Sequence, residues 1–106
     1  MSDEDPGAAH RLVLSDQVND VIAGLEARNR AREQALPACR LVIRTSGSSI
    51  RAVHRLDARA ADDLAAEAEA ALRTAQSVLE PHPSVAHAGF LHDAEKEYAE
   101  ARLFCA

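Results

Sequence analysis

An alanine-rich amphipathic stretch at the centre of the chain is the feature that most restricts its possible folds. Residues 58–80 read ARAADDLAAEAEAALRTAQSVLE. Apolar residues recur there at intervals of four, four, three and four residues: Leu64, Ala68, Leu72, Ala75 and Leu79. This spacing places them on one face of an α-helix. We therefore expect a helix here, with Asp57 as its N-cap, whose alanines let a partner helix approach closely.

Composition extends this expectation to the whole chain. Of the 106 residues, 47% are apolar but only 3% are aromatic. Alanine and leucine supply most of the apolar content, which favours helices over strands. Four glycines and four prolines are too few for short strands joined by tight turns. We predict a single all-α domain, an antiparallel bundle of three to four helices.

A polar tail is expected to precede this bundle. Residues 1–14 begin with acidic side chains, contain Pro6-Gly7 and show no helical periodicity. We therefore expect a disordered tail there and a helical domain over residues 15–106, with Ser15-Asp16 as the first cap. Pro37 should then break or kink the first helix, because proline removes a backbone hydrogen bond and clashes with the preceding turn.

Two further segments complete the expected bundle. Residues 39–55 keep one apolar phase on both sides of TSGSS (45–49), so we expect helix through these hydroxyls despite their low helix propensity. The sequence Pro-His-Pro at 81–83 should end the alanine-rich helix. A last helix is expected from about Ser84. It ends in the apolar residues Leu103 to Ala106, with no glycine cap. We expect either a chain truncated at its C-terminus or a partner that covers this end.

Charge and cysteine content bear on the class of protein. The net charge is −5, from 17 acidic residues against 12 Lys and Arg, which is not the balance of a strongly basic nucleic-acid binder. No apolar run of about 18 residues predicts a membrane span, and the N-terminus lacks the pattern of a secretion signal. Cys39 and Cys105 form neither a disulfide framework nor a zinc motif. These features predict a cytoplasmic protein with no membrane association.

A row of arginines accompanies the apolar stripe of residues 39–55. Arg40, Arg44, Arg51 and Arg55 recur at intervals of four, seven and four, so they share one helical face. Such a row can follow a phosphate backbone. It can equally form salt bridges to the acidic residues of the next helix, namely Asp62, Asp63, Glu67 and Glu69. Aromatic side chains for stacking bases are few.

A cluster of acidic residues lies near the C-terminus, in HDAEKEYAEA (92–101). Helical geometry puts Asp93, Glu97 and Glu100 on one face. Mg²⁺ is often held by one or two carboxylates, with water and substrate phosphate filling its other positions. The competing interpretation is a solvated acidic face, partly offset by Lys96 and Arg102. Spacing alone favours the solvated face.

Three segments read together resemble the translin family, to which translin and its partner Trax belong. They are AREQALPACRLVIRTSGSSIRAVHR, the alanine- and glutamate-rich helix, and HPSVAHAGFLHDAEKEYAEA. The matching features are the basic helix that ends in His54-Arg55, the HP at 82–83, the AGF at 88–90 and the EYAEA at 97–101. The resemblance covers residues 31–104 and is closest to the N-terminal half of archaeal members.

The resemblance implies a fold and a function. It implies the N-terminal part of an all-α bundle whose subunits form closed homo-oligomers that bind single-stranded RNA or DNA. In this chain Arg40, Arg44, Arg51, His54 and Arg55 would contact the nucleic acid. In the Trax branch an Mg²⁺-dependent endoribonuclease uses two acidic pairs, and Glu97 and Glu100 occupy the first as catalytic and metal-binding residues. The second pair would lie beyond residue 106, so the resemblance implies a partial nuclease.

A second hypothesis comes from a different class of protein. In it the chain is a non-catalytic helical module with no nucleic-acid role, which oligomerises through its alanine-rich faces. Few aromatic residues make a thin core, and self-association would compensate for this.

Overall fold

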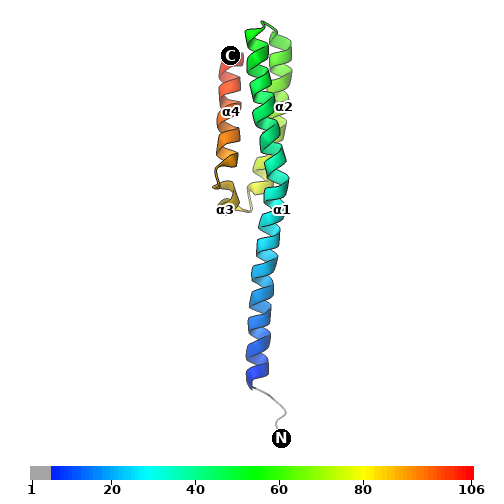
Figure 1. Ribbon diagram of the computed structural model, residues 1–106, viewed down its shortest axis with the longest axis vertical. Helices are drawn as coiled ribbons and strands as arrows, with labels where there is room; N and C mark the ends of the chain where they lie inside the picture. Colours follow the sequence, from blue (N-terminus) through cyan, green and yellow to red (C-terminus); the bar gives the residue numbers. More distant parts are fainter. Residues whose placement is uncertain (1–5) are drawn as a thin grey trace. The chain divides into compact units, whose positions relative to one another are not determined.

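The computed structural model describes residues 6–106, which fold into four α-helices and no strand (Figure 1). These helices are α1 (Pro6–His54), α2 (Ala58–Leu79), α3 (Pro83–Ala86) and α4 (Phe90–Cys105). The prediction of an all-α protein is therefore confirmed for this part of the chain. The chain divides within α1 into two units, one ending at Arg30 and the other spanning Ala31–Ala106. None of the helices described is long and apolar enough to cross a membrane.

The second unit contains the helical bundle. From Ala31 onward, α1 packs against α2 and α4, and the chain reverses direction between successive long helices (Figure 1). Two side-chain contacts show that α1 and α4 run parallel: the guanidinium of Arg32 lies over the ring of Phe90, and His54 contacts Phe104. Helix α2 is therefore antiparallel to both of its neighbours.

The core of this bundle consists mainly of small side chains. The buried residues of α2 are Ala61, Ala65, Ala68, Ala71, Leu72, Ala75 and Leu79. Ala71, Leu72 and Ala75 meet Cys39 and Val42 of α1 and Ala94 of α4 in one cluster, and Leu79 packs with Ala31 and Ala35 of α1 in a second. Because methyl groups occupy most contact positions, the helices can pack closely. The alanine-rich face that the second hypothesis assigned to oligomerisation is thus buried within the chain.

Three hydroxyl residues of TSGSS lie in this core without interrupting the helix. Thr45 Oγ1 donates a hydrogen bond to the carbonyl of Leu41 (2.7 Å), and Ser49 Oγ donates one to the carbonyl of Ala61 in α2 (2.7 Å). Two of the buried hydroxyls are thereby satisfied, which offsets the cost of removing them from water. The expected helix across residues 45–49 is confirmed.

Helix α1 differs from the expectation at Pro37. It continues through this residue, so of the two effects predicted for Pro37, a break or a kink, the break does not occur. Pro37 is exposed. The carbonyl of Glu33, which has lost its amide partner at Pro37, can therefore be hydrated. Ala35 and Cys39 on either side are buried in the bundle, and their packing holds the helical path.

Helix α1 also begins earlier than expected. It starts at Pro6, so residues 6–14 are helical rather than part of a polar tail ending at residue 14. Proline is well suited to the first position of a helix, where its missing N–H would have no partner within the helix. Residues 1–5, the remainder of the expected tail, lie outside the described residues.

The connections between helices follow local backbone requirements. Asp57 caps α2 as predicted, with its Oδ1 accepting a hydrogen bond from the Ala60 N–H (3.1 Å). The last segment is not one helix from Ser84, because α3 ends at Ala86 and α4 begins at Phe90. Gly89 between them has φ = 106°, a conformation that side-chain-bearing residues rarely adopt.

Enlarging one core alanine should destabilise the bundle. Ala75 is fully buried between α1 and α4. Ala75→Leu should therefore lower the free energy of unfolding by about 1–3 kcal/mol, since extra methyl groups cannot be accommodated without strain. Ala70→Leu, at an exposed position of the same helix, is the matched control and should change it by less than about 0.5 kcal/mol. Urea denaturation followed by circular dichroism measures both, and equal effects would contradict close packing at Ala75.

Candidate functional site

The arginine row of α1 faces away from α2. Ser49 donates its hydrogen bond to α2, which defines the side of α1 that α2 covers. Arg51 lies two residues later, about 200° around the helix, so it points to the opposite side. Arg40 and Arg44 lie within about 20° of Arg51 around the axis. All three side chains are exposed, as is Arg55, which directly follows the end of α1.

These four guanidinium groups have no acidic partner among residues 6–106. The acidic residue of α2 that does form ion pairs is Glu69, with Arg73 (2.6 Å) and Arg102 (3.0 Å). Hydrogen bonds from these two arginines hold the pKa of the Glu69 carboxyl below its ordinary value. Of the four arginines in the row, Arg51 alone has a side-chain hydrogen bond, to Ser48 Oγ (2.9 Å). The described structure does not contain the salt bridges to Asp62, Asp63, Glu67 or Glu69 that were weighed as an alternative role for the row.

Glu100 of α4 also faces away from α2. Arg102 binds Glu69 of α2, and Glu95 accepts a hydrogen bond from Gln76 of α2 (3.2 Å). Glu100 precedes Arg102 by two residues, about 200° around the helix, so it projects from the opposite side. Ser49 also contacts Cys105 of α4 (3.4 Å), so the arginines on the opposite side of α1 face away from both α2 and α4. Glu100 and the arginines thus have in common that they project outward from the core.

Glu97 lies closer to the contact between α1 and α4. It is flanked at intervals of seven residues by Phe90 and Phe104, and residues seven apart lie about 20° apart on a helix. Both phenylalanines contact α1, through Arg32 and His54. Glu97 therefore sits on the edge of α4 that borders α1. Glu97 and Glu100 are both half-buried.

We refer to Arg40, Arg44, Arg51, Arg55, Glu97 and Glu100 together as the charged face. It combines positive side chains of α1 with two carboxylates of α4. Within residues 6–106 no group of three or more His, Cys, Asp or Glu residues is placed to hold a metal ion. Asp93, which helical spacing put on the same side of α4, is exposed one turn before Glu97.

An aromatic pair lies beside the end of the arginine row. The rings of His54 and Phe104 meet edge to face, with centroids 5.5 Å apart. His54 is exposed, and Phe104 is 48% exposed. Sequence reasoning named His54 as a nucleic-acid contact but did not assign a role to Phe104. The seven-residue spacing of Phe90, Glu97 and Phe104 was the signal that could have indicated its position.

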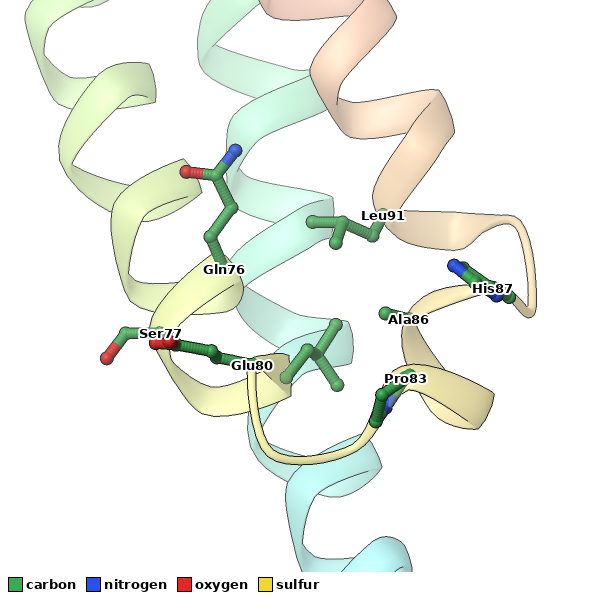
Figure 2. A pocket seen from close by; sticks show the side chains of 8 residues that line it. Gln76, Ser77, Glu80, Pro83, Ala86, His87 and Leu91 are labelled. Carbon is green, nitrogen blue, oxygen red and sulfur yellow. The ribbon is translucent and has the colours of Figure 1, made fainter.

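A cavity of about 420 Å³ lies elsewhere, between the end of α2, α3 and the start of α4. Figure 2 shows Gln76, Ser77 and Glu80 on one side of it, with Pro83, Ala86 and His87 opposite. Leu91 of α4 points toward this space (Figure 2). None of the residues predicted for the site contributes to its lining, so the cavity is separate from the charged face.

Comparison with known proteins supplies no relative. No model of a protein family matches the chain, and no curated protein or solved structure matches it significantly.

Proposed function

We propose that this protein binds single-stranded RNA or DNA through the charged face, in the manner that its resemblance to the translin family implies. The observation that carries the proposal is the row of four exposed arginines without acidic partners on one side of α1. Guanidinium groups bind phosphate oxygens with two parallel hydrogen bonds, and a row of them can follow a backbone. Glu69, the acidic residue of α2 that forms ion pairs, forms them with Arg73 and Arg102 and not with the arginine row.

The aromatic pair supports a single-stranded rather than a double-stranded ligand. Unpaired bases can stack on exposed rings, whereas bases within a duplex present only their edges. His54 directly precedes Arg55 and lies about one turn after Arg51, so a base could stack on the His54–Phe104 pair while its phosphate contacts the arginines.

Glu97 and Glu100 are suited to a loosely held Mg²⁺ ion. They are two half-buried carboxylates, which is the number of protein ligands that Mg²⁺ commonly takes. When bound, the ion would position a water molecule and offset charge on the scissile phosphate. The chain's own contribution would be to supply these two carboxylates from α4. Glu97 and Glu100 correspond to the first of the two acidic pairs of the Trax endoribonuclease. With this pair alone we expect a partial endoribonuclease that cleaves slowly at most.

We further propose a cytoplasmic location. Cys39 and Cys105 are both free thiols in the folded chain. Burial raises the pKa of the Cys39 thiol, which keeps it in its unreactive form. Free thiols are typical of a reducing compartment.

Binding to a single-stranded oligonucleotide should depend steeply on salt and on the arginines. Each phosphate contact on a single strand contributes about 0.7 to the slope of log K against log salt concentration. Arg51→Ala/Arg55→Ala should therefore reduce the slope by about 1.4, and weaken binding at low salt. Filter binding across a salt series measures both quantities.

The control for this experiment is Arg73→Ala, which removes an exposed arginine of α2 outside the charged face. It should leave the slope unchanged. Absence of binding by the unmodified protein at low salt would reject the proposed function.

Any cleavage of single-stranded RNA should require Mg²⁺ and the two carboxylates. We expect Glu97→Ala/Glu100→Ala to reduce the rate at least ~10-fold, because the ion loses both of its protein ligands. Gel analysis of a labelled RNA, with and without a chelator, measures this. Glu95→Ala is the matched control, since this carboxylate lies on the α2 side of α4. Equal rates in the double variant and the unmodified protein would exclude Glu97 and Glu100.

A tryptophan at position 104 should report base stacking. The chain contains no tryptophan, so Phe104→Trp introduces a single tryptophan beside His54. Its emission should be quenched by an oligonucleotide and unaffected by an abasic strand of the same length, because only bases stack on the ring. Leu103→Trp, at the exposed neighbouring position, is the control. Equal quenching by both strands would show that position 104 senses the phosphates and not the bases.

A further inference from the structure

The first unit of α1 exposes a stripe of large apolar side chains. Leu14, Val18, Val21, Ile22 and Leu25 lie within about 100° of the helix circumference. Each is between 46% and 61% exposed. Isolated apolar residues on a surface are ordinary, but five on one narrow stripe mark a contact surface.

The stripe has the spacing of a coiled coil. Leu14, Val18, Val21 and Leu25 follow one another at intervals of four, three and four, which are the a and d positions of a heptad. The same phase continues along α1 to the buried residues of the second unit: Ala35, Cys39, Val42, Ser46 and Ser49. In the second unit this stripe is covered by the helices of the bundle. In the first unit it is exposed.

The side chains of the stripe are suited to pairing with the same stripe of a second copy of the chain. The e and g positions beside its four a and d residues are uncharged, namely Ser15, Gln17, Ile22 and Gly24, and Asp16 and Asp20 project from the opposite side of the helix. These flanking positions place no like charges against one another across a paired stripe, and Arg11 and Arg28 occupy the a and d positions just beyond its two ends. A lipid surface would instead favour basic and aromatic side chains. Residues 12–25 contain no Lys, Arg, Phe, Tyr or Trp.

We propose that residues 14–25 of two copies of this chain pair through this stripe as a short two-stranded coiled coil. The inference is independent of nucleic-acid binding. Covering the five side chains on both copies would bury on the order of 1,000 Å², at the lower limit of specific interfaces, so the dimer should have a dissociation constant near the micromolar range.

The test is sedimentation equilibrium of the full-length chain from ~1 to ~100 μM, a range that brackets such a constant. The unmodified protein should pass from monomer to dimer. Val18→Glu should weaken the dimer at least ~100-fold, because it would place two carboxylates in the centre of an apolar contact. Val13→Glu makes the same change at a valine that is equally exposed but lies off the stripe, and should alter the constant less than ~3-fold.

Several results would overturn the proposal. A chain that stays monomeric throughout the range excludes pairing of copies, and binding of that monomer to phosphatidylserine vesicles would assign the stripe to lipid. Dimerisation that Val18→Glu leaves unchanged would place the interface elsewhere. Thermal unfolding of each variant separates these outcomes from loss of the bundle, since the second unit should melt at the same temperature in all three proteins.

Discussion

Close packing of small side chains between α2 and its two neighbours is the interaction on which the rest of the structure depends. The alanines of α2 let α1 and α4 lie against it at short range, and Ser49 adds a hydrogen bond to the Ala61 carbonyl at one end of the contact. The sides of α1 and α4 that do not meet the core remain on the surface. The arginines and the two glutamates occupy this surface because their positions are out of phase with the packed residues. The charged face thus follows from the same periodicity as the core.

Sequence patterns predicted those parts of the fold that depend on local periodicity and capping. The helix at 58–80, its Asp57 cap and the helix through residues 45–49 are examples. Of the break or kink predicted at Pro37, the break does not occur because burial of Ala35 and Cys39 outweighs one lost backbone hydrogen bond, and such burial is a property of the assembled bundle. The division of the last segment at Gly89 was missed because its positive φ is set by how α4 returns to the bundle.

The candidate site shows the same division between local and tertiary information. The arginine row could be recognised from intervals of four and seven residues, because all of its members belong to one helix or directly follow it. The lack of acidic partners for this row could not be predicted from the sequence, because it depends on Glu69 facing Arg73 and Arg102 in the folded chain. The pairing of His54 with Phe104 joins residues 50 positions apart and arises from the parallel alignment of α1 and α4. The exposed stripe of residues 14–25 was visible as a pattern, but its exposure required the structure.

The alanine core has a consequence for how the fold responds to temperature. Unfolding raises the heat capacity in proportion to the apolar area that becomes hydrated. Alanine contributes a single methyl group, and Leu79, Val42 and Cys39 are the largest side chains that are fully buried. The heat-capacity change of unfolding per residue should therefore lie at or below the lower end of the usual range, about 12 cal/mol/K. A small increment flattens the curve of stability against temperature, so this bundle would lose little of its folding free energy on cooling.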